Sequence, residues 1–529
     1  MYEYRSDRSE VEVPYSDVLS FVLDGPHAEA HARKKESLVP ADRSELSSPA
    51  CAIGTDSLQK YLYPVLFLAI VGSGATFLGL NPSCTTGETD HAIKVANVKF
   101  ILVQPPCFEA MASMAAQSGI PSDHVLVFDG ELSDHEEETS NLHTWGKLLS
   151  HGEQDWIRFD DEESAGTTPA ALFLTSGTTG MPKAAVHTHY ALVTKYLVTQ
   201  DRPKPYEVRR LITVPMFHAF AAVLVHIAPS VEGCTTYIAP RFKLDSCIGF
   251  AKRYGITEWP MVPQIISRLV DSIQSQAEHS DTLKSIRLVS CGGAPLPLEL
   301  KRNLEKLLHS EARVAEQWGM SEVGTITNFP YPETDDSGSV GTIFPNTRIR
   351  LRDAEGQYIS QDECPGEIIV HTPSRMLGYL GDPTSTNVVL SPDGWYTTGD
   401  IGYCRKGKWY IVDRAKDIIK VRGWQVAPAE LEACLLGHPQ VKDAAVIGVR
   451  RQGDVSELPR AYVVHDGSGV ISLSEKDVAT FLQDRLAGYK SLDGGVKFVE
   501  TIPRNTSGKI LRRVLREMAE QEGFNTKIA

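Results

Sequence analysis

The chain has 529 residues, 42% of them hydrophobic and 23% charged, which excludes a largely disordered or fibrous protein. This length predicts about two to four structural units. The 53 Lys and Arg against 67 Asp and Glu give a net charge of −14, which argues against a nucleic-acid binder but leaves room for a small anion held by a few local cations.

Nine cysteines without a C-x-x-C pair predict reduced thiols inside the cell, rather than a disulfide framework or a zinc site. No basic region followed by an apolar core opens the chain, and its last residues do not match a peroxisomal S-K-L ending. We therefore expect a cytoplasmic protein, with the peroxisome as the alternative.

The apolar stretch Tyr61–Leu80 is long and uncharged enough to span a bilayer. Three glycines near its end, however, indicate a break between a helix and a strand, as in an α/β unit. We expect a buried helix over Tyr63–Val71 and a buried strand over Thr76–Leu80, with a membrane span as the alternative.

Short β-branched runs then alternate with amphipathic stretches. The runs Phe100–Val103 and His124–Phe128 flank a helical pattern around Cys107–Gln117, and similar runs lie at Leu211–Val214 and Ile286–Val289. Strands separated by helices predict parallel sheets with helices on both faces.

From about residue 340 the pattern changes to short strands and turns, as at Arg348–Leu351 and Gly366–Val370. These predict a small β-rich subdomain over about residues 340–412.

A compact tail of mixed helix and strand patterns follows, with a helix over Ala429–Leu436 and a strand over Ala444–Val449. The predicted architecture is α/β, with an N-terminal domain of parallel α/β sheets and the β-rich subdomain in residues 1–412. A small α+β C-terminal domain would occupy residues 413–529.

The strongest local motif is the loop LTSGTTGMPK, which ends at Lys183 and follows the apolar run Ala170–Leu174. Its glycines and hydroxyl residues offer backbone N–H and O–H donors, and the lysine adds a positive charge, as a polyphosphate requires. The loop is not a Walker motif, and taken alone it is equally compatible with an ordinary turn.

Two later segments suit the base and the sugar of a nucleotide. In QWGMSE, Trp318 can stack on a purine and Glu322, four residues on, can hold Mg²⁺ on phosphate oxygens. The segment GWYTTGD ends in Asp400, an acid suited to ribose hydroxyls, and Ile411–Arg414 supplies a second sugar contact.

Two lysine-bearing segments complete the series. KDIIKVRGWQVAPAE begins at Lys416, and NTSGK presents Lys509 on a tight turn. Each segment alone has an ordinary structural explanation, but their joint occurrence in this order is very improbable by chance.

Together these motifs resemble the adenylate-forming superfamily of acyl-CoA synthetases, 4-coumarate:CoA ligases, luciferases and peptide-synthetase adenylation domains. The resemblance covers about residues 60–513. The 4-coumarate:CoA-ligase-like branch is the part of the family that three segments resemble most: Pro205–Leu211, Pro215–His218 and Val426–Ala433. Within it, the sequence pattern is most similar to that of fungal acyl- and aryl-CoA ligases of secondary metabolism.

The resemblance implies an AMP-forming ligase that uses ATP, Mg²⁺ and coenzyme A and no nucleic acid. A carboxylate would attack the α-phosphate of ATP to give acyl-AMP and pyrophosphate, and the thiol of CoA would then displace AMP. An aromatic and apolar acyl pocket would suit an aryl or medium-chain acid.

The resemblance also implies the nucleotide-binding residues. The phosphate loop would cradle the β- and γ-phosphates, the segment after Gly292 would flank adenine, and Glu322 would ligate the metal. The implied set is Thr175, Ser176, Gly177, Thr178, Thr179, Gly180, Lys183, Gly293, Ala294, Pro295, Trp318, Gly319, Ser321, Asp400 and Arg414.

Lys509 would bridge the substrate carboxylate and the α-phosphate. An ammonium there lowers the barrier electrostatically, because negative charge gathers on phosphorus while one anion attacks another. No general base is required, since a carboxylate is already ionised at neutral pH.

For the second step, the resemblance implies that the C-terminal domain rotates about a hinge at Lys416 and exchanges one set of catalytic residues for another. Lys420, as a catalytic residue of this step, and Gly423, Trp424 and Gln425 would then line the path of CoA.

His218 would stand at the mouth of the acyl pocket and gate the path to CoA, although a lone histidine is more often a core residue. Further lining candidates are Phe220, Cys291, Gln317, Thr325 and Ile326. Gln317 departs from the family, which usually has Gly there. We expect the longer polar side chain to favour a smaller or polar-bearing acid.

A larger departure lies upstream, where residues 33–60 show neither the strand nor the long helix that relatives carry. About one βαβ unit is expected to be shortened or lost. This leaves two alternatives to a CoA ligase: an adenylating enzyme that loads a carrier-protein thiol, and a catalytically impaired nucleotide-binding homologue. Nothing in the sequence favours a luciferase-like oxygenase.

Overall fold

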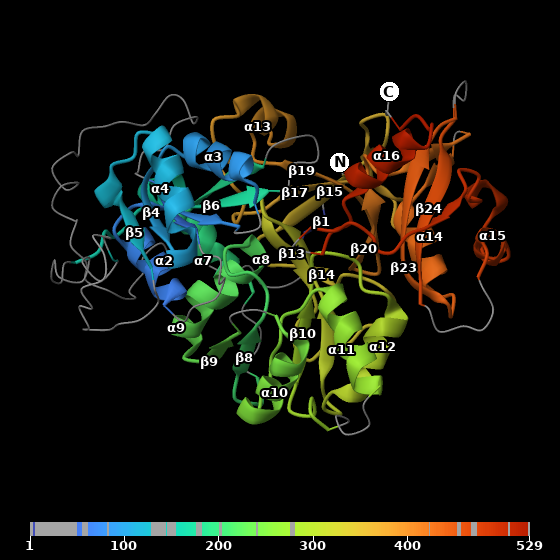
Figure 1. The fold of residues 1–529 in the computed structure, drawn as a ribbon, viewed down its shortest axis with the longest axis horizontal. Helices are drawn as coiled ribbons and strands as arrows, with labels where there is room; N and C mark the ends of the chain where they lie inside the picture. The colour runs from blue at the N-terminus through green and yellow to red at the C-terminus, as the bar shows by residue number, and fades with distance from the viewer. Residues whose placement is uncertain are drawn as a thin grey trace.

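The computed structural model describes residues 4–5, 50–54, 62–81, 84–128, 144, 155–175, 182–199, 204–239, 242–275, 281–422, 424–451, 456–466, 473–505 and 508–526. Figure 1 shows the chain running from an α/β part with α2 to α7, through a second α/β part with α8 to α12, to a C-terminal part with α14 to α16 at the opposite end.

A seven-stranded sheet organises the first part, in the order β18-β7-β6-β3-β2-β4-β5. The strands from β6 to β5 are parallel, whereas β7 and β18 continue the sheet antiparallel. Their bounds are β2 Ala50–Gly54, β3 Thr76–Leu80, β4 Val98–Val103, β5 Val125–Val127, β6 Pro169–Thr175, β7 Lys183–Thr188 and β18 Gly378–Tyr379.

Both faces of this sheet are covered, because successive strand residues point to opposite sides. On β3, Phe77 belongs to one hydrophobic core and Leu78 to the other, and both are fully buried. The helices of this part are α2 Tyr63–Gly72, α3 Thr86–Val95, α4 Phe108–Gln117, α6 Glu162–Thr167 and α7 His189–Leu197.

The helix and strand predicted within Tyr61–Leu80 are confirmed as α2 and β3. No helix among the described residues has the length and hydropathy needed to cross a membrane. One expectation was wrong: residues 33–60 were expected to lack a strand, yet β2 lies between β3 and β4. Its sequence, ACAIG, is short and has small side chains, so it shows no local strand pattern and is recognised as a strand only by its pairing with β3 and β4. Residues 33–49 and 55–60 lie outside the described residues.

A second parallel sheet follows, consisting of β8 Arg209–Ile212, β9 Thr235–Ile238, β10 Leu288–Cys291 and β11 Arg313–Glu316. Parallel bridges at Glu258 and Met261 join its two halves. Trp259 lies fully buried between them. The covering helices are α10 Leu244–Tyr254, α11 Pro263–Ser275 and α12 Leu298–Leu307.

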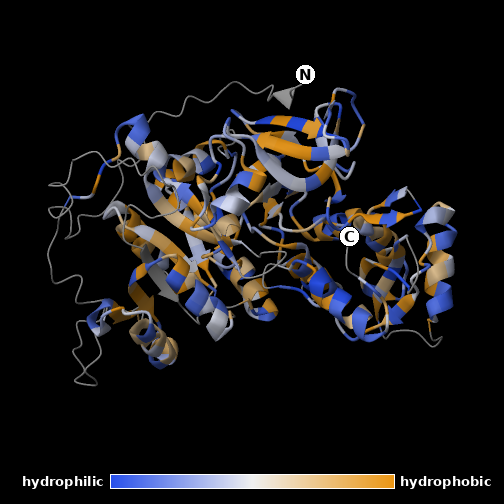
Figure 2. Cartoon of the chain, turned by 90° about the horizontal axis from the view of Figure 1, so that it is seen from above, coloured by the Kyte–Doolittle hydropathy of each residue, from blue (hydrophilic) through white to orange (hydrophobic). Residues whose placement is uncertain are grey.

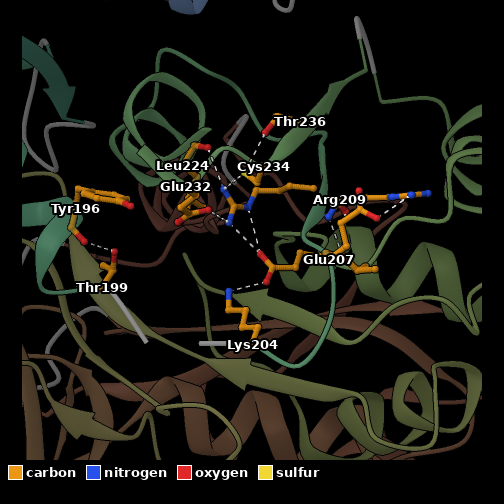
Figure 3. Close-up of polar contacts among 12 residues, drawn as sticks. Tyr196, Thr199, Lys204, Glu207, Arg209, Leu224, Glu232, Cys234 and Thr236 are labelled. Carbon is orange, nitrogen blue, oxygen red and sulfur yellow. Dashed lines mark hydrogen bonds and ion pairs between the residues drawn. The ribbon is translucent and has the colours of Figure 1, made fainter. Parts of the chain in front are cut away.

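Between β8 and β9 the chain forms a helix in three pieces, α8 Ala219–Ala222, the π-helical turn η4 Val223–Ile227 and α9 Ala228–Glu232. A buried ion cluster fastens this helix to the sheet: Arg210 pairs with Glu232 and Glu258, each at 3.0 Å. Lys204 pairs with Glu258 at 2.5 Å, and Figure 3 shows Lys204 and Glu232 reaching the cluster from different sides.

The β-rich part is an antiparallel sheet with the path β1-β15-β17-β19-β20 and β16 beside β15. Its strands alternate hydrophobic and hydrophilic residues, which Figure 2 shows as bands of two colours and which β19 repeats in its burial. The bounds are β1 Tyr4–Arg5, β15 Arg348–Arg352, β16 Tyr358–Ile359, β17 Gly366–His371, β19 Tyr396–Arg405 and β20 Lys408–Arg414.

A small sheet of β12 Trp318–Met320, β13 Gly324–Asn328 and β14 Thr342–Ile343 leads into this part. Helix α13, Pro383–Val389, lies between β18 and β19 in the chain.

Beyond β20 the chain packs around hydrophobic clusters of its own. A hairpin of β21 Ile419–Val421 and β22 Trp424–Val426 precedes a sheet of β23 Val441–Val449, β24 Leu458–His465 and β25 Val496–Phe498. The helices are α14 Pro428–Leu436, α15 Glu475–Gln483 and α16 Arg512–Gln521. The predicted order of parallel α/β, antiparallel β and α+β parts is confirmed.

Candidate active site

The turn Ser321–Gly324, between β12 and β13, carries two predicted site residues, Ser321 and Glu322. Three successive carbonyl oxygens of this turn accept hydrogen bonds, from His187 Nε2 at 2.8 Å, Met376 N at 2.7 Å and the Ser374 hydroxyl at 2.7 Å. At Gly319, just before the turn, an added Cβ would lie 2.4 Å from the Gly324 carbonyl oxygen, so only glycine fits this close hairpin.

Glu322 accepts a hydrogen bond from the Tyr379 hydroxyl at 3.0 Å, through Oε1. The described residues contain no group of three or more His, Cys, Asp or Glu side chains that could hold a metal ion. Mg²⁺ is commonly bound through one or two carboxylates together with substrate phosphates and water. Glu322 therefore fits a magnesium ion delivered on a nucleotide rather than an ion held by protein ligands alone.

Asp400 is the centre of the predicted ribose site and is 4% exposed. Its Oδ2 accepts a hydrogen bond from Trp318 Nε1 at 2.8 Å, and its Oδ1 pairs with Arg414 Nε at 3.0 Å. The structure thus brings Trp318, which lies 82 residues earlier in the chain, to the pair that Asp400 and Arg414 form across β19 and β20. Trp318 is buried and holds Asp400 by its edge, while stacking of its face on adenine remains a prediction.

Only the two ends of the phosphate loop are described, Thr175 at the end of β6 and Lys183 at the start of β7. Residues 176–181, which include Ser176, Gly177, Thr178, Thr179 and Gly180, lie outside the described residues. Lys183 Nζ donates to the Ser385 hydroxyl, lies 3.3 Å from Asp382 Oδ2 and sits 5.2 Å from the centre of the Tyr379 ring. Its ammonium is therefore held at the start of α13.

The candidate acyl pocket gathers around Gly292, which follows β10. A Cβ added there would lie 3.3 Å from both Gln317 Cγ and Phe220 Cε2, so these two predicted lining residues meet in front of the glycine. Gly293 next to it has a φ of +89°, which turns the chain toward Ala294 and Pro295.

The remaining lining candidates divide by burial. Thr325 is partly exposed, whereas Cys291 and Ile326 are fully buried within hydrophobic cores. This burial does not favour direct contact of the last two side chains with a substrate.

His218 begins α8, and its Nδ1 accepts a hydrogen bond from the Phe220 N–H at 3.2 Å. This bond requires the unprotonated nitrogen at Nδ1, so the neutral ring carries its proton on Nε2. Burial, and then the charge of Lys509, lower the pKa of His218 to about 4. The imidazole is therefore neutral at physiological pH.

Lys509 lies in the site although it comes from the C-terminal part. Gly508, with a φ of +85°, places the turn against Gln264, where an added Cβ would lie 3.0 Å from Gln264 Oε1. Burial, and then the charge of Arg414, lower the pKa of Lys509 to about 8, while Asp400 and Glu322 act in the opposite direction. The ammonium therefore lies within electrostatic range of the predicted nucleotide contacts.

The residues predicted for the CoA path are not brought to this site. Lys420 and Gln425 are exposed, and Trp424 is 57% exposed and stacks on Tyr489 with ring centres 4.6 Å apart. Lys416, the predicted hinge residue, lies within electrostatic range of Arg414 and Lys509. Gly423 lies outside the described residues. The structure thus has Lys509 in the site and the β21–β22 hairpin on the surface.

Four residues around the site were not predicted from the sequence: Tyr379, Asp382, His187 and Lys195. Tyr379 and Asp382 contact Glu322 and Lys183 from the segment GYLGD, whose sequence carries no recognisable chemical motif. His187 and Lys195 are buried, at 0% and 5% exposure, and only tertiary contacts distinguish them from core residues.

This fold and the convergence of Lys509, Glu322, Asp400 and Arg414 define an enzyme of the adenylate-forming class. The chain belongs to the AMP-binding enzyme family, whose model matches residues 57–380, and the model of the AMP-binding enzyme C-terminal domain matches residues 430–509.

Relatives and solved structures agree with this membership. The chain is 36% identical to a phenylacetyl-CoA ligase, epaB, from Aspergillus niger, over 97% of this chain and 98% of that protein. It is 35% identical to a nicotinic acid-CoA ligase, olcI, from Penicillium canescens, over 88% and 87% of the two chains. The crystal structure of ATP-bound MatB from Rhodopseudomonas palustris matches with a TM-score of 0.77 at 28% identity, covering 90% of each chain.

Proposed function

We propose that the protein is an ATP-dependent acid–CoA ligase that converts a carboxylic acid to its CoA thioester through an acyl-adenylate. The position of Lys509 within electrostatic range of Asp400, Arg414 and Glu322 carries this proposal, because it unites a catalytic cation with groups that suit a nucleotide. The proposed domain boundary is the predicted one, residue 412, with Lys416 as the hinge.

In the first half-reaction, the Lys509 ammonium would hold the substrate carboxylate against the α-phosphate and offset the charge that gathers there. Asp400, fixed by Trp318 and Arg414, would bind the ribose hydroxyls. Lys183 would leave Asp382 for the β- and γ-phosphates. Glu322 would ligate Mg²⁺, which neutralises phosphate charge when bound.

In the second half-reaction, the thiol of CoA would attack the acyl carbonyl and AMP would leave. His218 would present Nε2–H toward the acyl group, since its Nδ1 is engaged by Phe220 N–H. The exposed Lys420, Trp424 and Gln425 would reach the site only after the C-terminal part rotates, which removes Lys509 at the same time.

For the acid, we propose an aromatic or medium-chain carboxylic acid of fungal secondary metabolism. Phe220 and Gln317 at the pocket floor support an aromatic ring with a hydrogen-bonding substituent, and relatives named for phenylacetic and nicotinic acid point the same way. Eight of the nine cysteines form no disulfide in the part of the chain that the structure describes, which supports a reducing compartment such as the cytosol, with the peroxisome as the alternative.

The test is ATP–pyrophosphate exchange across a panel of carboxylic acids, followed by assay of thioester formation with CoA. We expect exchange with at least one aryl or medium-chain acid and thioester formation with free CoA. Exchange without a CoA thioester would instead support a carrier-protein acceptor, and absence of exchange with every acid would support the impaired nucleotide-binding homologue.

A further inference from the structure

The turn Ser321–Gly324 is anchored by hydrogen bonds to three of its carbonyl oxygens. Its three carbonyl hydrogen bonds come from two segments: His187 of β7 donates to Ser321, and the stretch Ser374–Met376 donates to Glu322 and Val323. Ser321 and Glu322 are predicted to contact the α-phosphate and Mg²⁺. A residue that holds this turn in place therefore also determines where those contacts are made.

His187 does more than fill space. Its ring is fully buried beside Phe173, with ring centres 5.4 Å apart, and its Nδ1 has no hydrogen-bond partner among the described residues. A buried unpaired nitrogen costs free energy that an apolar side chain of similar size would avoid. The contribution that an apolar residue could not make is the Nε2–H bond to the Ser321 carbonyl, whose 2.8 Å length is close to ideal.

Lys195 supports the same turn from α7. Its stem runs under Gly324, where an added Cβ would lie 3.2 Å from both Lys195 Cγ and Cε. Its Nζ lies 3.4 Å from His187 Nε2 and 5.3 Å from the centre of the Phe173 ring. Its amino group also interacts electrostatically with Glu322, while burial lowers the pKa of Lys195 to about 7. One buried side chain therefore lies against Gly324 and acts on Glu322.

We propose that His187, supported by Lys195, is a positioning residue that holds the Ser321–Gly324 turn in the position required for the α-phosphate and magnesium contacts. Neither side chain touches the substrate. The inference rests on the proposed function for its kinetic consequence, since the nucleotide triphosphate is present only in the first half-reaction. The structural consequence concerns the turn alone and is independent of catalysis.

The kinetic test compares His187→Leu with His187→Gln. Leucine fills the site without donating, whereas the amide of glutamine can replace Nε2–H. We expect His187→Leu to lower kcat/KM of pyrophosphate exchange about tenfold or more and to raise the Mg²⁺ concentration at half-saturation, as for residues that orient metal ligands. His187→Gln should recover most of the activity, and CoA transfer from supplied acyl-AMP should change less than twofold in both.

A merely structural role predicts the reverse order, because glutamine buries an additional polar group and leucine does not. Leucine performing as well as glutamine, or equal loss of both half-reactions in His187→Leu, would overturn the proposal.

Lys195→Met tests the support, with Lys301→Met as the matched control. Lys301 is also 5% exposed but lies on α12, where it interacts with Asp336 and Glu305. We expect Lys195→Met to slow exchange selectively and Lys301→Met to leave the ratio of the two half-reactions unchanged. The same ratio in both variants would contradict the role of Lys195.

Hydrogen–deuterium exchange of the ligand-free protein reports on the turn without catalysis. We expect the peptide covering residues 318–326 to exchange faster in His187→Leu than in wild type and His187→Gln, because one anchor of the turn is lost. If the wild type activated no acid, the proposed function would fail while this measurement still decided the positioning role. Unchanged exchange in His187→Leu would refute that role.

Discussion

At the scale of single residues, the site depends on charges held in fixed places before any substrate arrives. Asp400 is held at both oxygens, by Trp318 and Arg414, and Glu322 is held at one, by Tyr379. Lys183 is paired with Asp382. Such pre-orientation means that little reorganisation is needed when the nucleotide binds.

Lys509→Ala should abolish acyl-AMP formation and spare the second half-reaction. The loss of one positioned cation is expected to slow pyrophosphate exchange on the order of 100- to 1,000-fold, because the ammonium that offsets the charge gathering on phosphorus is removed. Thioester formation from supplied acyl-AMP and CoA is the internal control. Equal loss of both half-reactions would contradict the assignment.

The first half-reaction should also lose activity at alkaline pH. A lysine is charged below its pKa, and the pKa of Lys509 is about 8. Exchange should therefore decline with a midpoint at or somewhat above pH 8, since bound anions raise the pKa of a neighbouring ammonium. The side chain of Lys509→Arg stays charged, so the residual activity of this variant should not decline between neutral and alkaline pH. A decline that persisted in this variant would assign the titration to another group.

Gln317→Gly should widen the range of acids. The Gln317 side chain meets Phe220 in front of Gly292, so its removal opens space at the pocket floor. We expect kcat/KM for bulky aryl acids to rise about tenfold relative to that for small acids, in line with the effect of added methylene groups in a pocket. An unchanged order of preference across the acid panel would show that Gln317 does not limit the pocket.

At the scale of elements, the helix α8–η4–α9 places both His218 and Phe220, and it is attached to the second sheet by charge as well as by packing. Arg210 is 3% exposed, pairs with Glu258 and Glu232, and also donates to the Leu224 carbonyl of the π-helical turn at 3.5 Å. The cluster seen in Figure 3 therefore fixes the helix that carries the pocket mouth.

Arg210→Met should destabilise the protein by about 3–5 kcal/mol, since it leaves two carboxylates without their buried partner. The free energy of unfolding from urea titration measures this change. Arg302→Met is the control, because the Arg302–Asp336 pair is exposed and should contribute less than about 1 kcal/mol. Equal effects of the two substitutions would show that the buried cluster is not a structural brace.

At the scale of the whole molecule, the proposed mechanism needs two arrangements of the C-terminal part, one for each half-reaction. Lys509 occupies the site while Lys420 and Trp424 lie on the surface. The present arrangement therefore suits the proposed formation of acyl-AMP, and in the proposed mechanism the thioester step would require the C-terminal part to turn about the segment that contains Lys416.

Lys416→Pro should separate the two steps. Proline fixes φ at this position and restricts the residue before it. We expect pyrophosphate exchange to persist, because it needs no rotation of the C-terminal part. CoA transfer should fall at least about tenfold, because proline restricts the backbone rotation at the hinge. Lys416→Ala, which leaves the backbone free, should keep both activities. Unimpaired CoA transfer in the proline variant would place the hinge elsewhere.

The sequence by itself determined the class of fold and most of the chemistry. Alternating β-branched and amphipathic runs predicted the parallel sheets because burial on both faces leaves that pattern in the chain. Short motifs such as QWGMSE and NTSGK predicted Trp318, Glu322 and Lys509, since a phosphate site draws on few residue types.

Only the tertiary structure decided how these residues are supported. β2 is recognisable through its neighbours alone, because ACAIG has too little side-chain pattern to specify a strand. His187 donates to Ser321 across 134 residues of chain and Tyr379 donates to Glu322 across 57, while Lys195 lies against Gly324. Such contacts depend on packing between distant segments, and a single sequence carries no local signal of them.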